Sequence, residues 1–228
     1  RVANGNSSSD LDYRDTTAMI LNSGTITDAS GNNADLILPV PGNAGSLGAN
    51  KALVIDGVIP TVSSVTSVAA DTAYGAGDTL LLTLNFNKAV TVSGTPQLAL
   101  ETGANDAAIS YVGGSGTNAL NFQYIVATGD TSSDLDYTGT TALALGDGSI
   151  VDAVGNTANL ILPAVGATGS LSATKTLVID GVMPAISTVS SNAADSTYII
   201  GDTLLIVATF SEAVLVSGTP QLTLETGA

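Results

Sequence analysis

Carboxylates are the only abundant side chains in this chain that could do chemistry. The 228 residues include 20 Asp and Glu against 5 Lys and Arg, and they include neither Cys nor His. Only Glu101, Glu212 and Glu225 are glutamates, so 20 − 3 = 17 of the acids are aspartates. Without Cys and His the chain has no thiolate nucleophile, no imidazole base and no Cys/His zinc site. What remains is the binding of hard cations, or acid–base chemistry by pairs of carboxylates.

The aspartates are spaced in clusters that suit a hard cation. In a β-sandwich whose loops alternate between its two ends, five of them fall at the end where Asp180 leaves the domain: Asp71, Asp78, Asp130, Asp134 and Asp136. The exit of one unit would also lie near a loop of the next, such as the loop with Asp147 and Asp152. Ca²⁺ takes several oxygen ligands in flexible geometry, so we predict that it is bound. The candidate ligands are Asp10, Asp12, Asp56, Asp71, Asp78, Asp134, Asp136, Asp152 and Asp180.

A plainer interpretation is that these aspartates shape turns. At 28–32 and 152–156 the spacing Asp-Xaa-Xaa-Gly-Asn lets a carboxylate accept hydrogen bonds from its own backbone. Asp78 and Asp202 stand in Gly-Asp turns, where they would do likewise. The chain has no EF-hand loop and no nonapeptide calcium repeat, so spacing alone leaves both interpretations open.

Carboxylate pairs also serve glycosidases, but the pattern here does not favour catalysis. Asp134 and Asp136 recur as Asp10 and Asp12 in a neighbouring copy of the same motif, and active sites are rarely copied in tandem. The serines have no His partner for a Ser-His-Asp triad. Residues 113–116 separate two strand patterns and predict a hairpin turn, not a phosphate loop before a helix. We therefore expect that the protein is not an enzyme.

A repeat of 124 residues organises the whole chain. The motif SSDLDY occurs at 8–13 and 132–137, and LVIDGV occurs at 53–58 and 177–182, so that 132 − 8 = 177 − 53 = 124. Between residues 1–104 and 125–228, 64 of 104 positions are identical without insertion or deletion. A boundary at the proline after LVIDGV divides the chain into three parts. They are the C-terminal part of one repeat (1–59), a complete repeat (60–183) and the N-terminal part of the next (184–228).

The elements that must position these side chains are predicted to be strands. Apolar and polar residues alternate at 82–86 and 120–126, as in strands with one buried face. Clusters of Gly, Asp, Ser and Pro separate the further strand candidates, which are 62–67, 97–102, 107–112, 141–145, 160–162 and 176–180. No helical period is present. The predicted fold is all-β: tandem immunoglobulin-like antiparallel β-sandwich repeats with a 124-residue period.

The formal net charge of −15 argues against two classes of partner. Nucleic acids and anionic membranes attract cationic patches, which so few Lys and Arg cannot supply. No apolar run is long enough for a membrane helix, and no signal peptide is visible. The first residue is Arg1 and not Met, which suggests a piece of a longer protein. The expected partners are further copies of the same repeat, in cis and also in trans within a filament.

Four motifs resemble a known bacterial repeat family. They are GDTL at 77–80, VSGTPQL at 92–98, SGTNALNFQY at 115–124 and DAVGNTANLILP at 152–163. They are similar to the repeat of the cyanobacterial swimming-motility cell-surface protein and, more broadly, to the immunoglobulin-like repeats of giant surface adhesins. The resemblance covers essentially the whole chain. It implies an extracellular, cell-surface location and a stalk or fibre, often stiffened by Ca²⁺ at the junctions.

Two structural functions follow from the repeat and the resemblance. The first is a structural repeat of an extracellular bacterial surface filament or fibre-forming adhesin, which gives length and stiffness and assembles end to end. The alternative is a passive stalk module of a giant biofilm or cell-adhesion protein whose binding domain lies elsewhere. Terminal half-sandwiches with exposed strand edges favour the first, whereas near-identical repeats suit the second.

Overall fold

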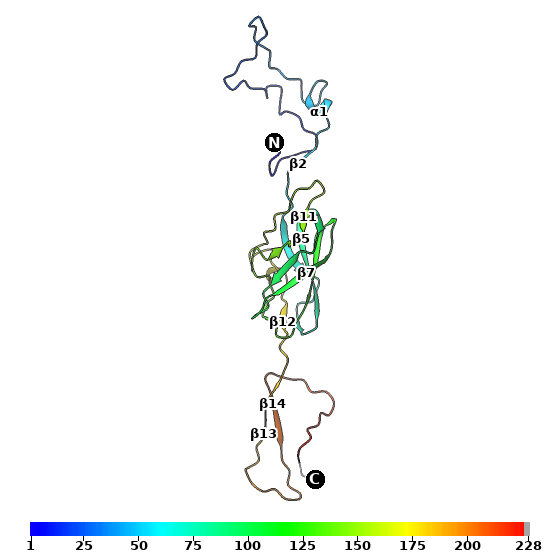
Figure 1. The fold of residues 1–228 in the computed structure, drawn as a ribbon, viewed down its shortest axis with the longest axis vertical. Coiled ribbons are helices and arrows are strands. Elements are labelled where there is room, and N and C mark those ends of the chain that lie inside the picture. Colours follow the sequence, from blue (N-terminus) through cyan, green and yellow to red (C-terminus); the bar gives the residue numbers. More distant parts are fainter. Residues whose placement is uncertain (226–228) are drawn as a thin grey trace.

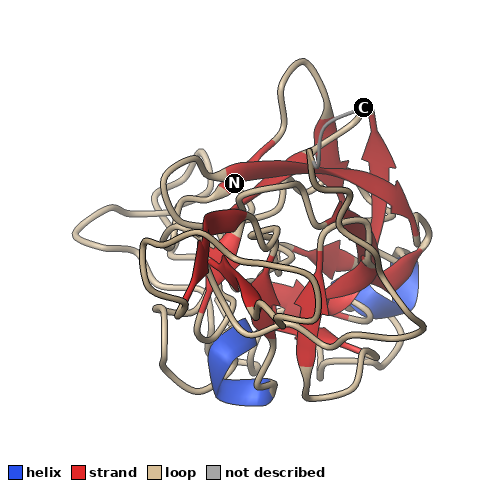
Figure 2. Cartoon of the chain, turned by 90° about the horizontal axis from the view of Figure 1, so that it is seen from below, coloured by secondary structure: helices blue, strands red, loops and turns tan. Residues whose placement is uncertain are grey.

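The chain forms three parts in a line, which the computed structural model describes over residues 1–225 (Figure 1). An N-terminal piece (1–59) and a C-terminal piece (described over 184–225) lie at opposite ends of a central unit (60–183). Within the described residues the secondary structure is almost entirely β, and only two one-turn helices occur (Figure 2). The expected all-β class is therefore confirmed.

A seven-stranded antiparallel sheet forms most of the central unit. Its order is β10-β6-β7-β8-β5-β11, and β3 pairs with β5 beside that path. The bounds are β3 Val62–Ser67, β5 Thr79–Ser93, β6 Gln97–Leu100, β7 Ala107–Gly113, β8 Thr117–Ile125, β10 Leu143–Ala144 and β11 Ser149–Val151. The hairpin predicted at 113–116 joins β7 to β8, as expected.

A small second sheet closes the unit where the chain leaves it. It contains β4 (Ala73–Gly75), β12 (Val178–Asp180) and β9 (Thr131–Ser132), with β12 in the middle. Strand β12 is antiparallel to β9 but parallel to β4, so the pairing is not purely antiparallel as the sequence pattern predicted. The parallel pair arises because the exit strand returns beside a segment about a hundred residues earlier, which local pattern does not reveal.

The core follows from the alternation in β5 and β8. Leu80, Leu82 and Leu84 of β5 pair with Tyr124, Phe122 and Leu120 of β8, in that order, and all six side chains are at most 1% exposed. Each such burial stabilises the fold by about 1.5–3 kcal/mol. Among residues 1–225, every buried hydrophobic side chain lies between Val65 and Ile179. The hydrophobic core therefore belongs to the central unit alone.

The two terminal pieces have strands but no buried hydrophobic side chains in the described residues. In the N-terminal piece β1 (Ser7–Ser8) pairs with β2 (Ile55–Asp56), and in the C-terminal piece β13 (Ile186–Ser191) pairs with β14 (Ile206–Phe210). Leu204 and Leu224 occupy the positions of the buried Leu80 and Leu100, 124 residues earlier, yet they are 45% and 51% exposed. The pieces thus carry core side chains without the strands that would cover them.

Two short helices were not predicted. They are α1 (Leu47–Asn50) and α2 (Leu171–Thr174), and each begins after a serine whose hydroxyl accepts a hydrogen bond from a backbone N–H in the first turn. Ser46 and Ser170 are the two capping residues. A helix of one turn has no 3.6-residue period to detect, so only the Gly-Ser-Leu sequence before it could have given a signal.

Candidate functional site

The densest group of charged contacts lies where the N-terminal piece meets the central unit. The Lys88 ammonium donates to Asp152 Oδ2 at 2.7 Å and to Asp56 Oδ2 at 2.9 Å and Oδ1 at 3.2 Å. It also donates to the Val58 carbonyl at 3.0 Å. Asp56 ends strand β2 of the N-terminal piece, whereas Asp152 belongs to the central unit. We name Asp56, Val58, Lys88, Asp152 and Asn156 the junction cluster.

The turn at 152–156 holds the buried carboxylate of the junction cluster. Asp152 Oδ1 accepts from the backbone N–H groups of Val154 at 3.1 Å and Asn156 at 2.8 Å, while Oδ2 accepts from Asn156 Nδ2 at 2.9 Å. Gly155 closes the turn with φ +91°, a conformation that favours glycine. Together with the bond from Lys88, each carboxylate oxygen of this 1%-exposed side chain accepts two hydrogen bonds.

Asn156 adds a second link across the junction. Its Nδ2 group also donates to the backbone carbonyl of Asp56 at 2.9 Å. The N-terminal piece contains the same turn, in which Asp28 accepts from Ser30 N, Asn32 N and Asn32 Nδ2. The turn therefore forms on its own, and its use at the junction requires Lys88 and the approach of Asp56.

Opposite charges set the ionisation of the cluster. Burial alone would raise the pKa of Asp152, but hydrogen bonds from the Lys88 ammonium and from Asn156 outweigh it and hold that pKa well below its ordinary value. Hydrogen bonds to Asp152 and then Asp56 raise the pKa of Lys88, against a smaller effect of burial. Asp152 and Lys88 are therefore both charged over the physiological pH range.

The aspartates expected to gather near Asp180 have separate partners. Asp71 pairs with Lys175 Nζ at 2.8 Å and accepts from Thr176 N at 3.1 Å. Asp78 accepts from Gly75 N at 2.8 Å, within its own turn. Asp180 accepts from Val182 N at 3.4 Å, two residues along the chain.

Asp136 is buried and anchors the segment before and within α2. Its Oδ2 atom accepts from Ser172 Oγ at 2.6 Å, Ser172 N at 3.3 Å and Gly166 N at 3.4 Å. Asp12, the equivalent residue of the N-terminal piece, accepts a hydrogen bond from Gly42 N at 3.0 Å, and Gly42 is the equivalent of Gly166. Asp10 and Asp134, two residues before each of them, are exposed.

The structure supports the turn interpretation for several of these residues. Asp28, Asp78, Asp152 and Asp202 all accept hydrogen bonds from nearby backbone N–H groups, so that alternative is confirmed for them. Over residues 1–225, no group of three or more acidic side chains is placed to hold a metal ion. Of the candidate ligands, Asp56 and Asp152 do meet across the junction, but an ammonium lies between them. Ca²⁺ binding by these residues therefore stays a prediction.

Lys88 and Asn156 are the site residues that sequence reasoning missed. Lys88 lies 32 residues from Asp56 and 64 residues from Asp152, so no local spacing joins them. One signal was available: in a chain with 5 basic and 20 acidic side chains, each lysine is a scarce partner. Lys88 also interrupts the alternation of β5, because it stands between Phe86 and Val90 at a position where the pattern predicts an apolar residue.

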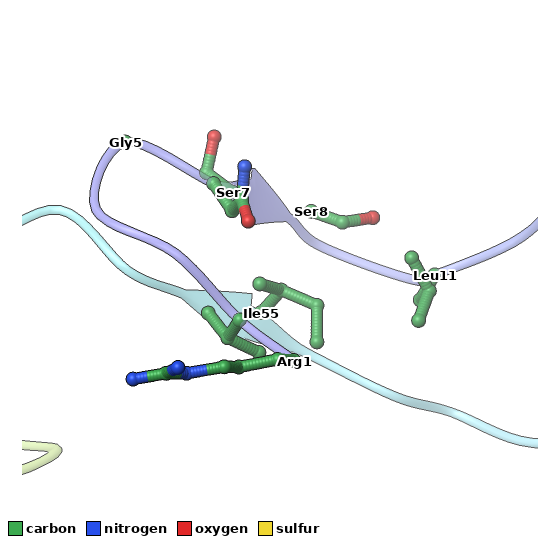
Figure 3. Close-up of a pocket in the computed structure, with 8 residues that line it drawn as sticks. Arg1, Gly5, Ser7, Ser8, Leu11 and Ile55 are labelled. Carbon is green, nitrogen blue, oxygen red and sulfur yellow. The ribbon is translucent and has the colours of Figure 1, made fainter.

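Two surface hollows lie in or beside the N-terminal piece. One, of about 350 Å³, adjoins the junction cluster and is lined by Val2, Val54, Ile55, Asp56, Val154 and Asn156. The other, of about 510 Å³, lies between the segment of β1 and strand β2 and is lined by Leu11 and Ile55 among others (Figure 3). In the central unit, Leu135 and Ile179 occupy the equivalent positions and are buried, with β4 alongside. The larger hollow is thus a place that core side chains fill in the complete unit, whereas the missing equivalent of β4 would pair with the other edge of β2, away from β1.

Comparisons with protein-family models, curated proteins and solved structures found no match for this chain. In the part of the chain that the structure describes, neither helix has the length and hydropathy to cross a bilayer. The function must therefore be argued from the arrangement of the three parts and from the junction between them.

Proposed function

We propose that the chain is a structural repeat segment of an extracellular bacterial surface filament or fibre-forming adhesin. The observation that carries this proposal is the linear arrangement in Figure 1: the chain enters the central unit at one end and leaves it at the other. Immunoglobulin-like units with a 124-residue period, joined in this way, add length with every copy. The strong acidity keeps neighbouring filaments apart in solution.

End-to-end assembly is supported by the complementary faces of the terminal pieces. In the N-terminal piece the edge of β2 that β4 would cover is open, and the C-terminal piece has the equivalent of β4 exposed, with Tyr198 at 40% and Ile199 at 74%. In the central unit, Tyr74 of β4 pairs with Ile179 of β12 in this place. A further copy, in cis or in trans, supplies the covering strand, as in strand addition to an open sheet edge.

The alternative function is a passive stalk, and it is favoured by the buried core of the central unit. The central unit holds the whole hydrophobic core of the described residues and needs no partner to complete it. A stalk built from such units would be elongated and monomeric, and its binding domain would lie elsewhere on the polypeptide.

Electron microscopy and light scattering of the 228-residue chain test the proposal. We expect elongated particles that join end to end, in buffer with about 5 mM Ca²⁺ and again with a chelator, a concentration above the weak end of extracellular calcium sites. Loss of the filaments with chelator would support the predicted Ca²⁺ sites at junctions. Short rods that stay monomeric in both conditions would favour the stalk, and round particles would contradict both functions.

A further inference from the structure

Position 88 of the repeat differs in charge between neighbouring units. Because 88 + 124 = 212, the equivalent of Lys88 in the C-terminal piece is Glu212. The carboxylate across the junction is kept, since Asp56 corresponds to Asp180, and 56 + 124 = 180. A position that carries an ammonium at the first junction therefore carries a carboxylate at the second.

The first junction has its positive charge built into the chain. The Lys88 ammonium lies 2.7 to 3.2 Å from four oxygen atoms. Three of these belong to the carboxylates of Asp56 and Asp152, which come from different units, and the fourth is the carbonyl oxygen of Val58. This is the position that a divalent cation would need in order to join Asp56 to Asp152. The residues present therefore do not fit a Ca²⁺ site, because the ammonium already neutralises and bridges both carboxylates.

The C-terminal piece keeps, within itself, the contacts that flank position 88 in the central unit. Ser211 accepts a hydrogen bond from Ala185 N at 3.0 Å, as Asn87 does from Thr61 N at 2.9 Å within the central unit. Ser211 N also donates to the Ala185 carbonyl at 2.8 Å. Glu212, next in the chain, has its Oε1 atom buried without a hydrogen-bond partner. The surroundings of position 88 are thus alike in the two units except for its charge, while the equivalents of Asp152 and Asn156, at 152 + 124 = 276 and 156 + 124 = 280, lie outside the 228 residues.

We propose that the residue at position 88 sets the rigidity of each junction, such that Lys88 locks the first junction without any divalent cation and Glu212 leaves the second unlocked. The lock acts because the contact between units is otherwise small: Asn156 contributes a single hydrogen bond to the Asp56 carbonyl, and the linker crosses at Gly57 to Pro60. Domains joined by few contacts move relative to each other by default. Stiffness then varies along the array according to one side chain per repeat. This inference deepens the proposed function and rests on it.

Distances between spin labels across the first junction test the lock in the full chain. The chain has no Cys, so the exposed residues Asn50 and Thr128 can be replaced by labelled Cys without background. We expect one narrow distance distribution, unchanged when a chelator replaces Ca²⁺. Lys88→Met, which removes the charge, and Lys88→Glu, which copies the second junction, should each replace it by a broad one.

Two controls separate a junction effect from misfolding. Lys175→Met removes an ammonium that pairs with Asp71 inside the central unit, so it should leave the distribution across the junction narrow. A second label pair at Asn118 and Thr128, both in the central unit, should be unaffected by every variant. A narrow distribution in Lys88→Met, or one in the unaltered chain that requires Ca²⁺, would overturn the proposal.

Failure of the lock and failure of the proposed function give different results. If the lock is wrong, the junction distances do not depend on Lys88 while microscopy still shows elongated particles. If the structural function is wrong, microscopy shows round particles whatever the label distances are.

Discussion

At the residue scale, the aspartates divide into those that hold the fold together and those that face water. The pair Asp134 and Asp136 shows the division over three residues: Asp136 is 4% exposed and bonded to the α2 segment, and Asp134 is exposed. Burial of a polar side chain is tolerated when hydrogen-bond donors of the protein replace the lost water. Some acidic side chains of this chain therefore hold the fold together through hydrogen bonds, while others contribute charge to its surface.

Replacement of these two residues should have unequal effects on stability. Asp136→Ala leaves the buried N–H group of Tyr137 and the half-buried hydroxyl of Ser172 without their acceptor, so it should lower the free energy of unfolding by about 1–3 kcal/mol. Asp134→Ala should change it by less than about 0.5 kcal/mol. Urea unfolding followed by tyrosine fluorescence measures both, and equal losses would show that Asp136 has no special role.

At the element scale, the exit strand is fixed by a glycine after it. Gly181 N donates to the Asp130 carbonyl at 2.7 Å and the Gly181 carbonyl accepts from Gly129 N at 2.9 Å. Gly57 makes the same pair of bonds with Asn6 and Gly5 in the N-terminal piece. The repeated Asp-Gly sequence is thus explained by close backbone approach at the end of the unit.

A side chain at Gly181 should not fit. A methyl group there would collide with the carbonyl oxygen of Ala127, so Gly181→Ala should destabilise the central unit by about 1–3 kcal/mol. Gly139→Ala is the matched control, because nothing lies within 4 Å of its added methyl. Thermal unfolding of the two variants decides the matter; a Gly181→Ala protein as stable as the control would contradict the close approach.

The sequence predicted elements well where one face is buried over several residues. The alternation in β5 and β8 placed Leu82, Leu84, Phe122 and Tyr124 in the core, and all four are buried. The pattern failed for contacts between distant segments: the parallel pairing of β12 with β4 and the bridge from Lys88 to Asp152. Residues 160–162 form no strand although they alternate: Leu162 N donates to the Thr140 carbonyl at 2.9 Å, but no ladder of strand pairing includes these residues.

At the scale of the whole molecule, the junction cluster gives a definite pH range for rigidity. The carboxyl of Asp152 has its pKa lowered from an ordinary 3.8, so the stability it adds is present above about pH 4 and is lost as the pH falls below that. The pKa of Lys88 is raised from 10.5, so its contribution is present below about pH 10 and is lost as the pH rises further. Both pH limits therefore lie far from neutral pH.

The spin-label distribution across the first junction should therefore stay narrow from about pH 5 to 9 and broaden only outside about pH 3 to 11. Lys88→Met should be broad at every pH, because it has no ammonium to lose. The readout is the same pair of labels at Asn50 and Thr128. Broadening of the unaltered chain between pH 5 and 9 would mean that some other titrating group controls the junction.

The parallel pairing of the exit strand also determines how the unit responds to force. Strand β12 continues into the linker that leaves the unit, and it lies between β4 and β9 with Gly181 anchored just beyond it. At the entry, Thr61 pairs in parallel with Asn159. The hydrogen bonds of such pairs lie across the strands, so tension along the molecule shears several of them together instead of opening them one after another. Pulled from its two ends, the central unit should give way abruptly and at high force.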